Sequence, residues 1–172
     1  IIVVDDGSTD DTAAIIEKYA KQCMFIRRPH TGFVQALNTG IQRAAGRYVI
    51  ILDADDTFES SMLQEMYNKI QKHPVAGFIY CNYYEKNLQT GQQKVVSTKN
   101  NVFHTLAEGI LFKRSVFEKV GLYDETLFFA EYDMLIRVLK KYKGTHINKH
   151  LFTYNRYQGT LTAKKERVEH GK

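Results

Sequence analysis

Two apolar runs that each lead into acidic residues constrain the fold of this chain more than any other feature. Residues 1–4 (IIVV) lead into Asp5 and Asp6, and residues 48–52 (YVIIL) lead into the acidic segment 53–56 (DADD). A short run that is apolar on both faces is typical of a strand buried in a parallel sheet. Ligands of open α/β sheets bind outside the carboxyl ends of the strands, so these acidic ends are the first candidates for a functional site.

Helical and strand patterns alternate along the rest of the chain. Gly46 and Gly121 are typical residues just past helix C-termini, and His73 followed by Pro74 ends another helical stretch. Such alternation predicts an α/β fold with a mostly parallel, Rossmann-like sheet flanked by helices. We expect helices over residues 13–20, 33–45, 60–72, 112–120 and 131–143, and strands over residues 1–4, 24–26, 48–52, 77–84, 92–97, 145–147 and 151–154.

Length and composition predict a single globular domain over residues 1–172. Of these 172 residues 44% are hydrophobic, enough for a sizeable core. No apolar run reaches the ~18–20 residues of a membrane span, and no secretion signal is visible. Cys23 and Cys81 cannot build a disulfide framework and lack metal-ligand spacing. We therefore expect a cytoplasmic protein in a reducing compartment.

The charge of the chain is unevenly distributed. Residues 1–135 hold 14 Lys and Arg against 17 Asp and Glu, whereas residues 136–172 hold 10 against 2. A basic tail predicts an anionic partner such as phosphate or an anionic membrane surface, with the protein lying peripherally at the inner face of the membrane. Nucleic acid is the weakest of these predictions, because no known nucleic-acid module is recognisable. The alternative is a solvated charged helix and tail.

The acidic segments favour a divalent metal. Mg²⁺ and Mn²⁺ take one or two carboxylates and complete their shell with water and phosphate oxygens. Asp53 and Asp55 can both face one ion if the backbone stays extended, and the alternative is a turn and helix-cap cluster. A third acidic group, Glu131 and Asp133, is either a helix cap or the source of a general base.

The order of these motifs resembles that of glycosyltransferase family 2, whose members have the GT-A fold. The resemblance spans residues 1 to about 160, and its motifs follow one another at fitting separations. The matching segments are residues 4–10 (VDDGSTD), 32–40 (GFVQALNTG), 45–48 (AGRY), 52–56 (LDADD), 112–114 (FKR), 120–125 (VGLYDE) and 131–133 (EYD).

The resemblance implies an inverting, metal-dependent transferase that moves a sugar from a nucleotide diphosphate donor, most simply a UDP-sugar, to a glycan or lipid-linked acceptor. Asp5 and Asp6 would bind the donor, with Asp6 holding the uracil ring. Asp53 and Asp55 match the D-x-D motif that holds Mn²⁺ or Mg²⁺; Asp55 would be the main metal ligand, and Asp53 would face the ribose or the metal. Glu131 matches the catalytic base.

Two further residues are assigned to the donor site. Asn38 would shape the donor pocket, with helix packing as the alternative, and Arg156 would contact the diphosphate, with a solvated loop arginine as the alternative. We assign residues 1–100 to the nucleotide-sugar half and residues 101–172 to the acceptor half with the basic tail.

The chain departs from the family pattern in three places. The family's opening strand and helix are expected to be absent, Ala130 and Glu131 replace the usual Glu-Asp pair, and Tyr157 stands where many members have His. These departures keep a catalytically impaired nucleotide-sugar-binding module open as an alternative. A receiver-type phosphoacceptor domain, which also has acids at two strand ends, is a remote one.

Overall fold

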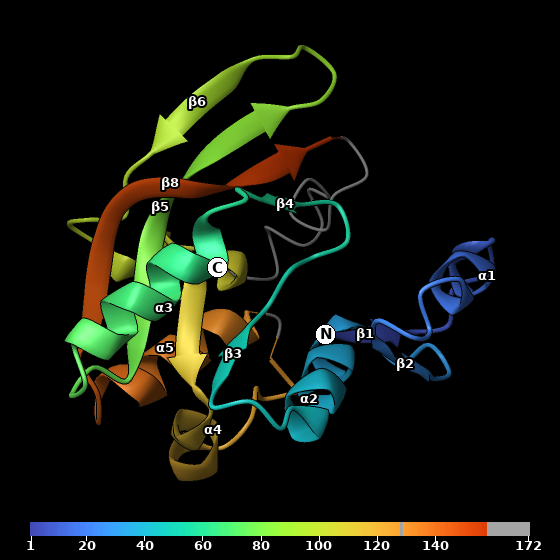
Figure 1. The fold of residues 1–172 in the computed structure, drawn as a ribbon, viewed down its shortest axis with the longest axis horizontal. Coiled ribbons are helices and arrows are strands. Elements are labelled where there is room, and N and C mark those ends of the chain that lie inside the picture. Colours follow the sequence, from blue (N-terminus) through green and yellow to red (C-terminus); the bar gives the residue numbers. More distant parts are fainter. Residues whose placement is uncertain (128, 158–172) are drawn as a thin grey trace.

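The computed structural model describes residues 1–127 and 129–157, so the polar tail expected from Ala163 lies outside the described residues. Strands and helices alternate along it (Figure 1). The elements are β1 (Ile2–Asp5), α1 (Thr12–Glu17), β2 (Met24–Arg27), α2 (Phe33–Arg43), β3 (Tyr48–Ile50), β4 (Thr57–Phe58), α3 (Met62–Lys72), β5 (Phe78–Asn87), β6 (Gln93–Val96), η1 (Val102–His104), η2 (Ala107–Gly109), β7 (Ile110–Lys113), α4 (Arg114–Val120), α5 (Ala130–Leu139) and β8 (Gly144–Arg156).

The strands form two sheets. β1 and β2 pair in parallel, and in Figure 1 they project with α1 from the rest of the protein, which they join through α2. The larger sheet has the order β3-β7-β5-β8-β4, with β6 paired to β5. The predicted α/β architecture is thus confirmed.

Strand pairing is more mixed than the sequence predicted. In the larger sheet β5 and β8 are parallel, but β3–β7, β5–β7, β5–β6 and β4–β8 are antiparallel. A parallel connection needs a crossover, usually a helix. Between β5 and β7 the described chain has only the hairpin strand β6 and the short turns η1 and η2, so β7 returns antiparallel to β5.

The core lies on both faces of the larger sheet. Strand side chains alternate between faces, so Phe78 and Phe112 pack against α4 and α5, while Ile79 and Leu111 pack against α3. The helices cover these sheet faces with apolar side chains spaced three or four residues apart, which lie on one side of each helix. α3 contributes Met62, Met66 and Ile70, and α5 contributes Met134, Leu135 and Val138.

Several element ends differ from the prediction by two to four residues, and two predictions need a larger correction. The helix expected over residues 112–120 begins only at Arg114, because Ile110–Lys113 form β7 and pair with strands on both sides. The two late strands are one, β8, whose register with β5 shifts on either side of Asn82. At this irregularity the buried Asn82 side chain forms hydrogen bonds: its Oδ1 accepts from Thr98 N at 2.9 Å and lies 2.9 Å from His146 Nε2.

Candidate active site

Carboxylates from three elements gather at one edge of the larger sheet. Asp53 follows β3, and Glu108 in η2 precedes β7. Since β7 is antiparallel to β3, the end of one strand lies beside the start of the other. The first turn of α5 adds Glu131, close enough for the charge on Asp53 to affect it. We call Asp53, Asp55, Asp56, Glu108 and Glu131 the carboxylate edge.

Asp53 and Glu108 form a hydrogen-bonded pair of carboxyl groups. Glu108 is 4% exposed, and its burial, together with the charge on Asp53, raises its pKa well above the ordinary value. Burial also raises the pKa of Asp53, while the bond from Glu108 lowers it. Glu108 is therefore the protonated partner that donates to Asp53, and it anchors the Asp53 side chain.

Asp55 and Asp56 are neighbours in one turn but differ in burial. Asp56 is buried; its Oδ1 accepts a 2.8 Å bond from Asn155 N, and its Oδ2 has no hydrogen-bond partner. Burial raises the pKa of Asp56 to about 6. Asp55 is exposed, and its carboxylate accepts a hydrogen bond from the Tyr157 hydroxyl. This turn thus presents one accessible carboxylate beside one buried oxygen without a partner.

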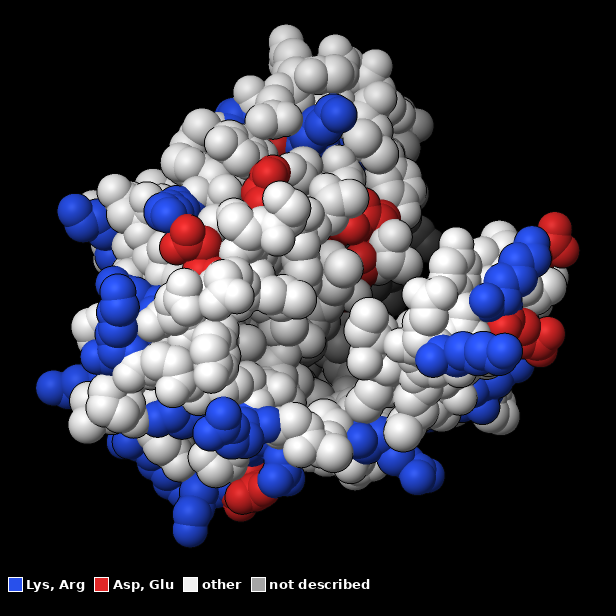
Figure 2. Space-filling model, viewed as in Figure 1, with Lys and Arg blue, Asp and Glu red and all other residues white. Residues whose placement is uncertain are grey.

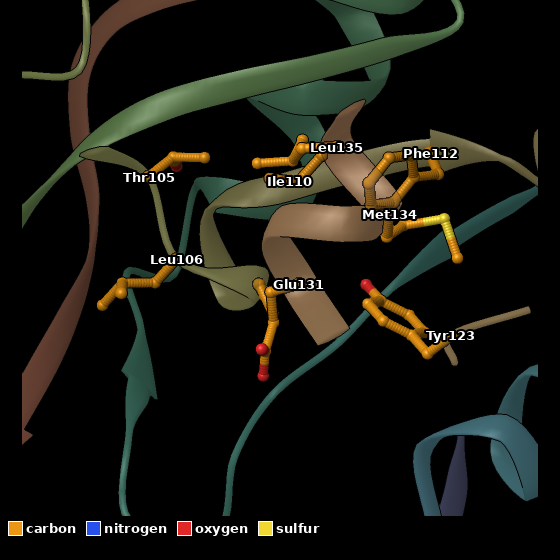
Figure 3. Close-up of a pocket in the computed structure, with 9 residues that line it drawn as sticks. Thr105, Leu106, Ile110, Phe112, Tyr123, Glu131, Met134 and Leu135 are labelled. Carbon is orange, nitrogen blue, oxygen red and sulfur yellow. The ribbon is translucent and has the colours of Figure 1, made fainter. Parts of the chain in front are cut away.

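Glu131 is half-buried beside Tyr123 at the start of α5 (Figure 3). Both residues line a cavity of about 10 Å³, the room needed for one water, together with Thr105 and the apolar side chains of Ile110 and Met134. Burial raises the pKa of Glu131, and the negative charge on Asp53 raises it further. A carboxylate with a raised pKa is a stronger base near neutral pH than an exposed one.

Asp133, the other acid of this segment, is held elsewhere. Its Oδ2 lies 2.7 Å from Arg137 Nε, and the same guanidinium donates to the carbonyl oxygens of Val120 and Leu122. Asp133 therefore ties α5 to the end of α4. Of the two acids, Glu131 is the one left facing the other carboxylates.

The carboxylate edge suits a metal ion that protein and substrate hold together, and does not suit one held by protein side chains alone. Among residues 1–127 and 129–157, no three His, Cys, Asp or Glu side chains converge closely enough to hold a metal ion. The ions that suit carboxylates need only one or two of them when substrate phosphates and water supply the rest. Asp55 is accessible, and the neighbouring Asp56 Oδ2 is buried without a partner. The residues present therefore fit a divalent cation that arrives with a diphosphate.

The acids that end β1 lie in a second group, on the projecting lobe. Asp5 is buried, and its pKa is lowered by hydrogen bonds from the Ser8 hydroxyl and from Ser8 N, the latter at 2.8 Å. Gly7 completes this turn with φ of +81°, and a Cβ there would meet His30 N at 2.6 Å. Only glycine fits this turn.

Asp6 binds the start of α2 in this structure. Its carboxylate accepts bonds from Gly32 N at 2.8 Å and Thr31 N at 3.2 Å, and Arg28 and His30 lie within ion-pair distance. Burial raises its pKa, but these bonds and charges outweigh it and lower the pKa overall. Its expected contact with a nucleotide base stays a prediction.

Asn38 and Arg156 both have partners within the protein. The buried Asn38 amide donates to Tyr123 O and Glu125 Oε1, each at 2.9 Å, and accepts from Tyr123 N at 3.0 Å. It thereby holds the segment that carries Tyr123 beside Glu131. Arg156 Nη1 lies 3.0 Å from Glu85 Oε1. The donor contacts expected of these two residues stay predictions.

Sequence reasoning missed Glu108, Tyr123 and Asn155 as members of this site. Glu108 carried a usable signal, because it is the one charged residue between Thr105 and Phe112 in an otherwise apolar segment. A charged residue buried in such a segment needs a partner. Tyr123 and Asn155 carried none, since their role depends on contacts across 85 and 99 positions of sequence.

Comparison with known protein families gives one clear match. The model of the family described as "Glycosyl transferase family 2" matches residues 1–130. Similar curated proteins include Glycosyltransferase GlyG of Streptococcus pneumoniae, 29% identical over 94% of this chain and 62% of its own length. Another is a cholesterol galactosyltransferase of Borreliella burgdorferi, 27% identical over 95% of this chain and 53% of its own. The chain thus spans less than two thirds of each of these relatives.

Solved structures show the same fold. S. aureus TarS 1–349 in complex with UDP-GlcNAc superimposes with a TM-score of 0.75 at 20% identity, covering 95% of this chain and 51% of TarS. The mannosyltransferase PcManGT from Pyrobaculum calidifontis, in complex with GDP-Man and Mn²⁺, gives a TM-score of 0.74 at 17% identity. The superposition covers 97% of this chain and 50% of PcManGT. At these identities the likeness concerns the fold.

Proposed function

Because the chain belongs to glycosyltransferase family 2, we propose that it transfers a sugar from a nucleotide diphosphate donor to an acceptor hydroxyl with inversion, at the carboxylate edge. The observation that carries this proposal is the position of Glu131. It is half-buried, has a raised pKa and lies close enough to Asp53 for the two charges to interact, whereas Asp133 is paired with Arg137. Membership of this family rules out the receiver-type alternative.

Glu131 acts as the general base in this proposal. As the acceptor oxygen attacks the anomeric carbon, Glu131 takes its proton, and the bond from that carbon to the diphosphate oxygen breaks. The diphosphate leaves with the electron pair of that bond. A single displacement on the face opposite the leaving group inverts the anomeric carbon. Tyr123, held by Asn38, packs beside the base and limits its movement.

The acids at the end of β3 serve the leaving group. Asp55 and Asp53 are the residues that would hold Mn²⁺ or Mg²⁺, which offsets the charge that develops on the departing diphosphate. Glu108 orients Asp53 through their hydrogen bond. The exposed position of Asp55 suits a residue that meets a cation brought in by the donor.

The donor and acceptor are proposed at the level of chemical class. Asp6 suits the recognition of a nucleotide base, since a carboxylate can accept from ring N–H groups, and a UDP-sugar is the proposed donor. TarS in complex with UDP-GlcNAc and PcManGT in complex with GDP-Man, both similar in fold, support a nucleotide sugar of some kind. The proposed acceptor is a glycan or a lipid-linked sugar.

The test combines donor binding with replacement of the base. In thermal-shift measurements on the full chain, a UDP-sugar with Mn²⁺ should raise the melting temperature more than the corresponding GDP-sugar. Glu131→Gln should keep this shift yet lower kcat by about 100-fold or more. Asp133→Asn is the matched control from the same helix and should keep most of the kcat. Unchanged transfer by Glu131→Gln would overturn the base assignment, and a folded protein without any nucleotide response would overturn the function.

A further inference from the structure

The end of the protein opposite the carboxylate edge is strongly basic. Four segments meet there: residues 43–48, 69–77, 113–121 and 139–144. Together they hold 10 Lys and Arg against one carboxylate, Glu118. Figure 2 shows this gathering of Lys and Arg around α4, away from the acidic residues of the upper part. We call it the basic end, and its exposed cations include Arg43, Arg47, Lys72, Lys119, Lys140 and Lys143.

Backbone contacts join these four segments into one surface. Arg114 N donates to Arg47 O at 2.9 Å, and Lys113 N donates to Gly77 O at 2.9 Å. Gly77 N in turn donates to Lys143 O at 3.0 Å. Lys141 Nζ donates to Lys119 O at 2.9 Å, so α4 and the end of α5 are also linked. The charges therefore lie on one rigid end, and not on independent loops.

Neutralisation within the protein does not account for this charge. Glu118 lies 2.8 Å from Arg114 Nη1 and is used by that pair. The helix dipole favours cations in or just after the last turn of a helix, which suits Lys72 at the end of α3 and Lys140 after α5. The dipole opposes a cation at a helix N-terminus, yet α4 begins at Arg114, directly after Lys113. Among the described residues, the pair of Arg114 with Glu118 is the only ion pair that these ten cations make, so the surface is free to meet an anionic partner.

The basic end also exposes an apolar tip. Val75 is 88% exposed in the turn between α3 and β5, close to Lys72 and next to Pro74, whose carbonyl accepts from Lys113 Nζ. An exposed aliphatic side chain with Lys72 and Lys113 nearby suits the headgroup boundary of a bilayer. Surfaces that bind single-stranded nucleic acid instead use exposed aromatic rings for stacking, and these four described segments expose none.

We propose that the basic end docks the protein on an anionic lipid bilayer. Docking there leaves the carboxylate edge open, because the two lie at opposite ends of β3. Tyr48 begins β3 and Asp53 follows five positions later, past the end of the strand, so the two are at most roughly 17 Å apart at about 3.3 Å per residue. The proposal does not depend on which donor or acceptor the site uses.

Vesicle sedimentation with the full chain tests the proposal. The protein should bind vesicles that contain phosphatidylcholine and phosphatidylglycerol, and should not bind vesicles of phosphatidylcholine alone. Binding should weaken steeply as the salt concentration rises from ~0.05 M to ~0.5 M. The variant Lys72→Glu/Lys119→Glu/Lys140→Glu should bind the anionic vesicles about 100-fold more weakly or worse. A matched control, Lys18→Glu/Lys21→Glu/Lys99→Glu, has the same net charge and should stay within about threefold of the parent chain.

The other outcomes each overturn the proposal. Absence of binding to anionic vesicles removes the lipid partner. Equal loss in both variants shows a response to net charge alone, and full binding by the basic-end variant places the contact elsewhere in the chain. Tighter binding of duplex DNA than of vesicles at equal salt shows another partner. Thermal unfolding of both variants confirms that they fold, and neither changes a residue of the carboxylate edge.

Discussion

Replacing Asp56 by Asn should stabilise the protein at neutral pH. Asp56 is 6% exposed, and one of its two carboxylate oxygens has no hydrogen-bond partner. Burial raises its pKa from 3.8 to about 6. A difference of about two pKa units corresponds to about 3 kcal/mol by which ionised Asp56 disfavours the folded state. Asn keeps the oxygen that accepts from Asn155 but buries an unpartnered amide group, so a net gain of about 1–2 kcal/mol remains.

The gain should depend on pH in a defined direction. Because the folded pKa lies above the unfolded one, the folded protein binds more protons between pH 3.8 and about 6. The favourable contribution of protonated Asp56 is complete below the unfolded pKa and is lost as the pH rises through the folded pKa. The advantage of Asp56→Asn should therefore be absent near pH ~3.5 and full near pH ~7.5.

Urea unfolding in a chelating buffer at these two pH values measures the effect. A gain of about 1–2 kcal/mol should appear at the higher pH as a rise in the midpoint without a change in slope. Asp11→Asn, an exposed position, is the matched control and should change little at either pH. If Asp56→Asn destabilises the protein equally at both pH values, the ionised Asp56 carboxylate does not disfavour the folded state.

Three further changes test the packing and the site. Gly144→Ala should cost about 1–3 kcal/mol in urea unfolding, because its Cβ would lie 2.4 Å from the facing phenylalanine ring of β5, whereas Gly40→Ala, in ordinary contact within α2, should be neutral or stabilising. Asn38→Ala should cost about 2–3 kcal/mol in the same measurement, because it loses its buried hydrogen bonds to Tyr123 and Glu125. It should also lower kcat, and an unchanged kcat at unchanged donor KM would refute the idea that Asn38 positions the segment beside Glu131. Arg156→Ala should change the free energy of unfolding by no more than about 0.5 kcal/mol, because its ion pair with Glu85 is partly exposed. A donor KM raised about tenfold would support the contact of Arg156 with the diphosphate, and an unchanged KM would contradict it.

Local patterns were enough for most of the elements. The apolar runs before Asp5 and Asp53 are strands, and the spacing of Met62, Met66 and Ile70 makes α3 a helix with one buried face. These predictions depend on periodicity within a few residues, which the local backbone follows. The segment around β7 is the counter-example. Its residues 112–120 have a helical pattern, but Ile110–Lys113 pair with β3 and β5 and become a strand.

The sequence alone determined the order of elements, the acidic ends of the strands, Glu131 as the candidate base, and the family to which the chain belongs. Tertiary structure decided which acids have partners: Asp53 has Glu108, Asp56 has the backbone of Asn155, and Asp6 has the start of α2. It also collected cations from four separate segments at one end of the molecule. The physical reason is the same in both cases. The energy of a charge depends on burial and on neighbours that are distant in sequence, and only the folded chain brings those neighbours together.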